Sequence, residues 1–100
     1  MRNCYIAHGS KLAARVLGTE VLIMSAPDST IFSLNEVGSL IWEGADGKTP
    51  LRRIVEEKVL SVFEIDSATA LADAEAFVTE LAAAGVLRVS ESPMNSEDAA

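Results

Sequence analysis

The spacing of apolar residues changes once along this chain, near Asn35, and this change limits the folds that the chain can adopt. Before Asn35, short runs of β-branched and aliphatic residues are separated by turn residues, which is typical of strands. After it, apolar residues recur every three or four positions, which is typical of helices. The predicted strands lie at 15–17, 21–24 and 30–34. The sequence therefore predicts an α+β fold of the winged helix-turn-helix kind, with a three-stranded antiparallel sheet followed by three helices.

The three predicted helices are bounded by residues that favour helix ends. Asn35 and Asp66 are good N-caps, because their side chains can accept hydrogen bonds from the first turn. Thr49-Pro50 places proline at a first helical position. Glycine at Gly47 and Gly85 favours termination. The elements predicted after the sheet are helices at 35–45, 50–62 and 66–84, and a closing strand or short helical extension at 86–89.

The length and composition indicate one globular domain. The chain has 100 residues, of which 49% are hydrophobic and 23% charged, and this balance argues against intrinsic disorder. Residues 1–11 have no apolar periodicity, so a flexible arm is expected there. Residues 12–90 are expected to form the folded domain, and residues 91–100 an acidic, disordered tail.

Charge and cysteine content exclude several classes of partner and site. The formal net charge is −7, with eight basic and fifteen acidic side chains, which argues against nucleic acid or a membrane as partner. Cys4 and His8 are the sole cysteine and histidine, so neither an internal disulfide nor a Cys/His metal site is expected. No signal peptide or membrane-spanning run is recognisable, and a reducing, cytoplasmic setting is expected.

Catalysis is not expected from this sequence. His8 and Cys4 fall in the predicted arm, and the six glycines form no phosphate-binding loop. The acidic residues lie on helix faces that are expected to be solvated. We therefore predict a non-enzymatic protein with no catalytic residue, no metal and no cofactor.

Two features favour peptide recognition. The predicted strand 30–34 lies at an edge of the meander and contains no Pro, Lys or Arg to protect it, so it is open to an added strand. The predicted helix 66–84 has an apolar arc bordered by a strip of small residues, which would let another backbone approach. The arc comprises Ala70, Leu71, Ala74, Phe77, Val78, Leu81 and Ala82. Each feature has an alternative explanation. The strand edge could be covered by a homodimer partner or by the helices, and the alanines could be present only because they favour helix formation.

The chain resembles the PqqD family in two stretches. Residues 32–47 (FSLNEVGSLIWEGADG) are similar to the family's apolar strand ending in Leu-Asn, helix with Ile-Trp and Asp-Gly stop. Residues 81–87 (LAAAGVL) resemble its Leu-rich helix that ends in Gly-Leu-Leu. The residues that look like structural signatures of the family are Leu34, Asn35, Ile41, Trp42, Asp46 and Gly47.

The resemblance implies a peptide chaperone that takes part in the biosynthesis of pyrroloquinoline quinone (PQQ) or of another modified peptide. Such proteins bind the leader of a ribosomally made precursor peptide as an added strand and present it to a modifying enzyme, often a radical S-adenosylmethionine enzyme. That enzyme is expected to act in trans, and a homodimer is a further expected partner. The residues expected to bind the peptide are Thr30, Ile31, Phe32, Ser33, Leu34, Leu71, Ala74, Glu75, Val78 and Ala82.

Two other functions remain open at the level of the sequence. A winged-helix transcription regulator would need a basic surface, and the only basic cluster comprises Arg52, Arg53 and Lys58, diluted by neighbouring glutamates. A dimerisation adapter would bind through the same strand edge without any dependence on a peptide.

Overall fold

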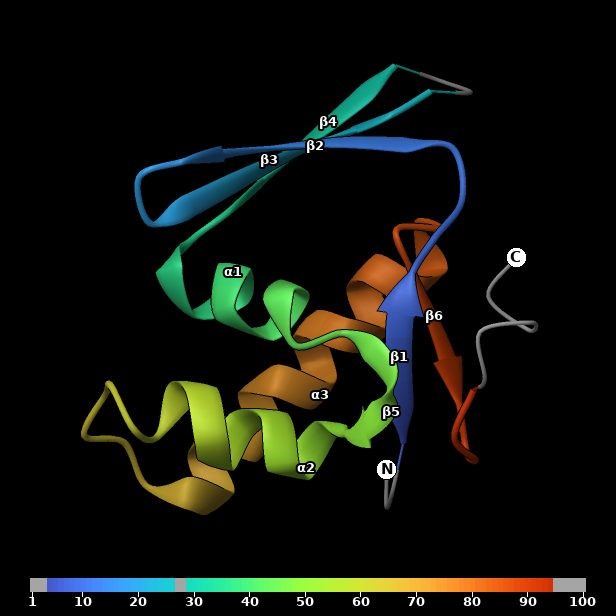
Figure 1. Cartoon of the computed structure of the whole chain (residues 1–100). Helices are drawn as coiled ribbons and strands as arrows, with labels where there is room; N and C mark the ends of the chain where they lie inside the picture. Colours follow the sequence, from blue (N-terminus) through green and yellow to red (C-terminus); the bar gives the residue numbers. More distant parts are fainter. Residues whose placement is uncertain (1–3, 27–28, 95–100) are drawn as a thin grey trace.

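The computed structural model of the chain describes residues 4–26 and 29–94, which form an α+β fold with two small sheets and a helical layer. One antiparallel sheet has the strand order β2–β3–β4 and covers the helices from one side, as Figure 1 shows. The second antiparallel sheet, β5–β1–β6, stands beside the helices. The predicted α+β class is confirmed, whereas the second sheet was not expected.

The first sheet is the predicted meander. It consists of β2 (Leu12–Leu17), β3 (Glu20–Ser25) and β4 (Thr30–Leu34). Gly18 has a φ of 65°, a left-handed conformation that suits the tight turn between β2 and β3. Alternation along β3 directs Val21 and Ile23 into the core and leaves Met24 exposed on the outer face.

The second sheet corrects the expectation of a flexible arm. Residues 5–8 form β1 (Tyr5–His8), which pairs with β6 (Leu87–Ser90) on one side and β5 (Asp46–Pro50) on the other. Ile6 is completely buried, so this strand is part of the core. Four residues are too few to display a period, and both partners lie far along the chain. Residues 1–3 of the predicted arm lie outside the described residues.

The helices begin close to where the capping residues predicted. The helices are α1 (Glu36–Glu43), α2 (Leu51–Ile54), the π-helical segment η1 (Val55–Val59) and α3 (Ser67–Ala83). Oδ1 of Asn35 accepts a hydrogen bond from Gly38 N at 2.8 Å, and Oδ2 of Asp66 accepts one from Thr69 N at 3.2 Å. The first helix ends earlier than predicted, at Gly44, because residues 46–50 are drawn into the second sheet.

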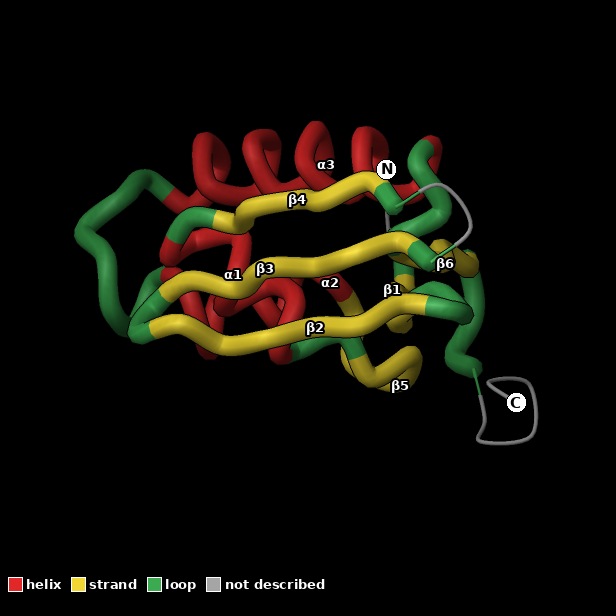
Figure 2. The backbone as a smooth tube through the Cα atoms, turned by 90° about the horizontal axis from the view of Figure 1, so that it is seen from above, coloured by secondary structure: helices red, strands yellow, loops and turns green. Residues whose placement is uncertain are grey.

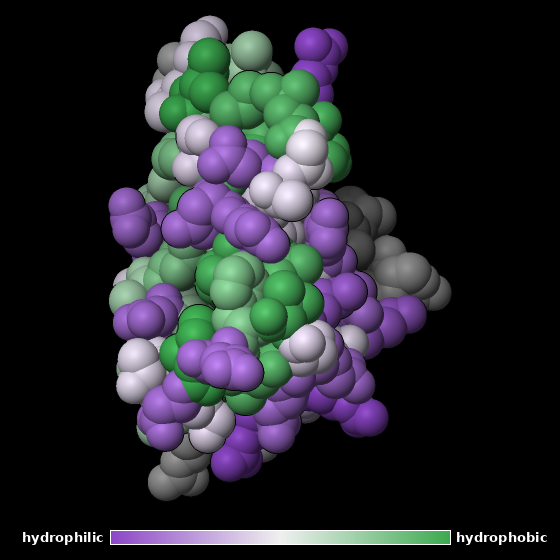
Figure 3. Space-filling model, turned by 90° about the vertical axis from the view of Figure 1, so that its left-hand side faces the viewer, coloured by the Kyte–Doolittle hydropathy of each residue, from purple (hydrophilic) through white to green (hydrophobic). Residues whose placement is uncertain are grey.

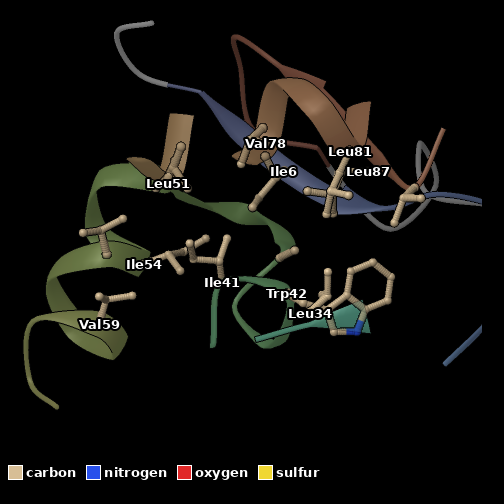
Figure 4. Close-up of a cluster of buried hydrophobic side chains, with 14 of the residues drawn as sticks. Ile6, Leu34, Ile41, Trp42, Leu51, Ile54, Val59, Val78, Leu81 and Leu87 are labelled. Atoms are coloured by element: carbon tan, nitrogen blue, oxygen red, sulfur yellow. The ribbon is translucent and has the colours of Figure 1, made fainter. Parts of the chain in front are cut away.

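The core lies where β1, α1, α2 and α3 meet. Figure 4 shows Ile6 of β1 beside Val78 of α3, with Leu81 and Leu87 close by. Trp42 is 5% exposed and belongs to this core. Its ring stacks on that of His8, with centroids 3.6 Å apart and an interplanar angle of 5°.

The beginning of the predicted tail is attached to the fold. Met94 N donates a hydrogen bond to Gly47 O at 2.7 Å, so residues 91–94 follow the surface beside β5. The remainder of the predicted tail, 95–100, lies outside the described residues, as do the turn residues 27–28. Over residues 4–26 and 29–94, no helix is long and apolar enough to cross a membrane.

Candidate functional site

The first component of the candidate site is the edge of β4. This strand pairs with β3 along its length, from Thr30 opposite Ser25 to Leu34 opposite Val21. On its other side no strand pairs with it within the part of the chain that the structure describes. In an antiparallel edge strand, alternate residues direct both backbone N–H and C=O away from the neighbouring strand. β4 therefore presents main-chain donors and acceptors along this edge.

The second component is α3, which runs alongside the open edge of β4, as Figure 2 shows. A groove with a volume of about 370 Å³ lies between the two elements. β4 supplies Ile31 to Leu34, with Asn35 at its end, and α3 supplies Phe77, Glu80 and Leu81. Leu34 and Leu81 are buried, whereas Ile31 is 61% exposed. The groove thus has an apolar floor, a backbone wall and an open top.

A second hollow, of about 240 Å³, continues the groove beyond the end of β4. It lies among α1, η1 and α3 and shares Asn35 and Phe77 with the groove. Its apolar walls include Ile41, Val59 and Ile65, and Asp73 is the charged residue that lines it. An extended chain seated along β4 would reach this hollow at one end.

The structure brings together the β4 half of the predicted site. Ile31, Phe32, Ser33 and Leu34 all line the groove. Thr30 is exposed at the start of the strand and does not line it.

The residues predicted on α3 are dispersed by the structure. Ala74 lines the second hollow, and Val78 is completely buried in the core. Leu71 lines a separate depression formed with α2 and η1. Ala82 is half-buried and lines neither the groove nor the second hollow.

Glu75 is directed toward β1 rather than toward β4. Burial raises the pKa of the Cys4 thiol above its usual value, and the neighbouring Glu75 carboxylate raises it further. Glu75 lines neither the groove nor the second hollow, and Cys4 immediately precedes β1, so the carboxylate lies on the side of α3 away from the β4 groove.

Sequence reasoning missed Phe77, Glu80 and Leu81 as the α3 side of the groove. Their spacing of three and four residues marks one stripe of a helix, so the signal was present. Phe77 and Leu81 do fall within the predicted apolar arc, but that arc is wide enough to face the core and the groove at once. Only the position of β4 distinguishes the part of the arc that faces the groove from the part that faces the core.

The described residues offer no arrangement for metal chemistry. Within 4–26 and 29–94, no three His, Cys, Asp or Glu side chains come together in a way that could hold a metal ion. Of the basic cluster on the second helix, Arg53 is paired with Glu57 at 3.3 Å. The open edge of β4 and the apolar side chains of Phe77 and Leu81 suit the groove to binding through backbone and apolar contacts.

Comparison with known families identifies this arrangement. The family model described as "Coenzyme PQQ synthesis protein D (PqqD)" matches residues 20–87, which include β4, α1 and α3. The chain belongs to the PqqD family. The resemblance seen in the sequence at residues 32–47 and 81–87 is thereby confirmed.

A solved structure extends the comparison of this PqqD-family chain to its fold. The structure is that of TbiB1 in complex with the TbiA(beta) leader peptide, and it aligns with a TM-score of 0.74 and 23% sequence identity. The alignment covers 82% of this chain and 94% of the TbiB1 chain. The two proteins share their fold. No curated protein sequence matches the chain significantly.

The family signature residues have structural positions in this PqqD-family chain. Leu34, Ile41 and Trp42 are buried, and Asn35 caps α1. The Asp46 carboxylate accepts hydrogen bonds from Lys48 N at 2.9 Å and Thr49 N at 2.8 Å. Leu34, Ile41 and Trp42 thus belong to the core, and the Asp46 contacts fix the backbone of residues 46–49.

Proposed function

We propose that the chain binds the leader segment of a ribosomally made precursor peptide and presents it to a modifying enzyme. The observation that carries this proposal is the open edge of β4, which faces α3 across a groove of about 370 Å³. Membership of the PqqD family and the shared fold with a leader-bound protein support the same function.

The leader would bind as an added strand along β4. Its backbone would bond to the outward N–H and C=O groups of residues 31–34, in the manner of β-augmentation. Alternate leader side chains would face the groove and pack on Phe32, Phe77 and Leu81. Main-chain bonds supply affinity in this mode, while the pockets for alternate side chains supply specificity.

The protein itself would be non-catalytic. PqqD-like recognition elements are in general binding domains. Cys4 is buried, and its pKa is raised rather than lowered, which disfavours the reactive thiolate. The chemistry would then belong to the modifying enzyme, for which a radical S-adenosylmethionine enzyme is our candidate. A cytoplasmic location would suit such a partner and keep Cys4 reduced.

The outer face of the first sheet is the surface that we assign to the enzyme. Leu17, Met24 and Ile31 are 51%, 46% and 61% exposed. Met24 and Ile31 line a hollow of about 390 Å³ together with residues 13–15 of β2. Figure 3 shows apolar side chains gathered over this sheet at the top of the molecule. Ile31 borders both this hollow and the groove, so an enzyme seated there would lie beside the bound leader.

A homodimer is the competing occupant of that face. Three strands of five or six residues present roughly 300 Å² of outer surface, whereas a stable interface needs about 800 Å² per partner. The face alone is thus too small for a stable dimer and better suited to a transient contact. Met24→Asp should weaken association with the enzyme and leave leader affinity unchanged. A sedimentation experiment that finds a dimer dissociated by Met24→Asp would instead assign the face to a second copy.

The test of the function is an amide NMR titration with the precursor peptide encoded nearest to the gene. Shifts concentrated in 31–35 and 77–81 would support strand addition in the groove. Shifts confined to the α2 side, around Leu71, would contradict this placement. Absence of shifts both with the peptide alone and with the enzyme added would overturn leader recognition and favour an adapter. A gel shift with duplex DNA at low salt tests the regulator alternative.

A further inference from the structure

The charged residues along the groove and its continuation all have the same sign. Asp73 lines the hollow beyond the end of β4, and Glu80 lines the groove beside β4. Among residues 4–26 and 29–94, no Lys or Arg lines either space. Both carboxylates come from α3, whose seventeen residues include no basic residue.

Neither carboxylate is neutralised by the described part of the chain. The side chains of Asp73 and Glu80 form no hydrogen bond or ion pair with another described residue. Both side chains are exposed at the rim of the site. An occupant of the groove would therefore meet two uncompensated negative charges in addition to the apolar floor.

Their separation defines a spacing in the occupant. Seven residues of helix separate Asp73 from Glu80, which corresponds to about 10.5 Å along the axis of α3. An extended peptide rises about 3.3 Å per residue and presents every second side chain to the same face. A spacing of two residues spans only about 7 Å, whereas four residues span about 13 Å. The flexible stems of Lys and Arg can absorb the remaining 2 to 3 Å.

We propose that the groove selects leader peptides carrying Lys or Arg at two same-face positions four residues apart, with an apolar residue midway between them. The midway side chain would lie near Phe77, which follows Asp73 by four residues and precedes Glu80 by three. The two basic residues would then face Asp73 and Glu80. This inference rests on the proposed leader-binding function and specifies the chemistry of the leader.

The charges contribute chiefly to selectivity and to the rate of association. Exposed ion pairs add little affinity, about two- to fivefold each, because water and salt screen them. The net charge of −7 acts over a longer range and attracts basic peptides before contact. Both effects weaken with ionic strength. Binding by the wild-type protein should therefore decrease with salt.

A displayed library of random twelve-residue peptides tests the proposal, because selection from it does not require the sequence of the leader. Peptides selected on the wild-type protein should be enriched in Lys or Arg at positions i and i+4, with an apolar residue at i+2. The double variant Asp73→Asn/Glu80→Gln should lose this enrichment. It should also bind the wild-type peptides about 5- to 20-fold more weakly, with a reduced salt dependence.

Glu75→Gln provides the matched control. It removes one negative charge from the same helix, on the side that faces Cys4 rather than the groove. The enrichment should persist in this variant. Equal loss of enrichment with Glu75→Gln would attribute the effect to the total charge and overturn the proposal.

The remaining outcomes separate this inference from the proposed function. Selected peptides that compete with one another at β4 but lack basic residues would overturn the spacing proposal and leave strand addition intact. Failure to select any peptide that perturbs residues 31–34 would overturn both.

Discussion

A Cβ atom on Gly38 would lie 2.9 Å from Cε1 of Phe77. Contacts this short essentially never occur between carbon atoms, so the Phe77 ring can take its present position because residue 38 lacks a side chain. The Phe77 ring lines both the groove beside β4 and the hollow beyond the end of β4. A residue of α1 thus determines where the aromatic wall of the candidate site stands.

Gly38→Ala should consequently disturb the site. The Phe77 ring is half-buried and at the end of a flexible side chain, so it can rotate away toward the groove. Overpacking of this kind costs about 1 kcal/mol or somewhat more. We expect leader affinity to decrease several-fold and the free energy of unfolding to decrease by about 1 kcal/mol. Isothermal titration and urea denaturation measure the two quantities.

Gly44→Ala is the matched control for this prediction. Its Cβ would lie 2.7 Å from Cγ2 of Ile54, on the side of α1 that faces the second helix. It should lower stability while leaving leader affinity unchanged. If both variants weaken leader binding equally, general destabilisation rather than Phe77 would be responsible.

Proline substitutions at Ile31 and Phe32 test the open edge of β4. Neighbouring residues of a strand direct their N–H groups to opposite sides, so one variant loses a bond to β3 and the other loses a donor on the open edge. The open-edge variant should remain folded, because proline is tolerated on edge strands. It should bind the leader about tenfold more weakly or worse. Thermal denaturation distinguishes the two variants, and a stable open-edge variant with unchanged affinity would contradict strand addition.

His8 should stabilise the fold through Trp42. Its ring stacks on the indole, and Nε2 lies 2.8 Å from Trp42 O. A stacked pair and a hydrogen bond are each worth about 1 kcal/mol. His8→Ala should lower the free energy of unfolding by about 1 to 2 kcal/mol, and His8→Phe should recover the stacking part. Urea denaturation at neutral pH measures both, and a His8→Ala variant as stable as the wild type would refute the prediction.

The sequence predicted those parts of the fold that local patterns encode. The first sheet, the caps at Asn35 and Asp66 and the long third helix all follow from turn residues, capping residues and periodicity. β1 and β5 do not, because each is short and acquires its strand conformation only by pairing. Residues 46–50 contain Asp, Gly and Pro, which disfavour strands, yet Ala7 pairs with Asp46 and Tyr5 with Pro50.

The candidate site was predictable to the same degree. The edge strand follows from the order of the meander and from the residues that it lacks. The side of α3 that lines the groove does not follow from the sequence, because the apolar arc of this helix faces both the core and β4. Leu71 packs toward α2 and η1 and Val78 into the core, while Phe77 and Leu81 turn toward β4. Tertiary packing therefore determines which side chains of α3 face the groove.

Asp46 should make the stability of the protein depend on pH in the acidic range. The slight desolvation of this exposed carboxyl alone would raise its pKa. Hydrogen bonds from the backbone N–H groups of Lys48 and Thr49 and from the Thr49 hydroxyl outweigh this effect and lower the pKa below its usual 3.8. A folded-state pKa below the unfolded one adds stability that is fully present above the unfolded pKa. That stability is lost as the pH falls through the folded pKa.

Asp46→Ala should therefore lower the free energy of unfolding by about 1 kcal/mol at pH 7, the value typical of a lost capping side chain. The difference from the wild type should shrink as the pH falls below 3.8, because protonation removes the charged acceptor from the wild type alone. Urea denaturation at pH 7, 4 and 2.5 measures it. Asp46→Asn retains an acceptor oxygen without the charge. It should therefore lose less stability at pH 7 than Asp46→Ala, and its stability should not depend on pH through residue 46. A difference between wild type and Asp46→Ala that grows toward low pH would mean that the carboxylate destabilises the turn between α1 and β5.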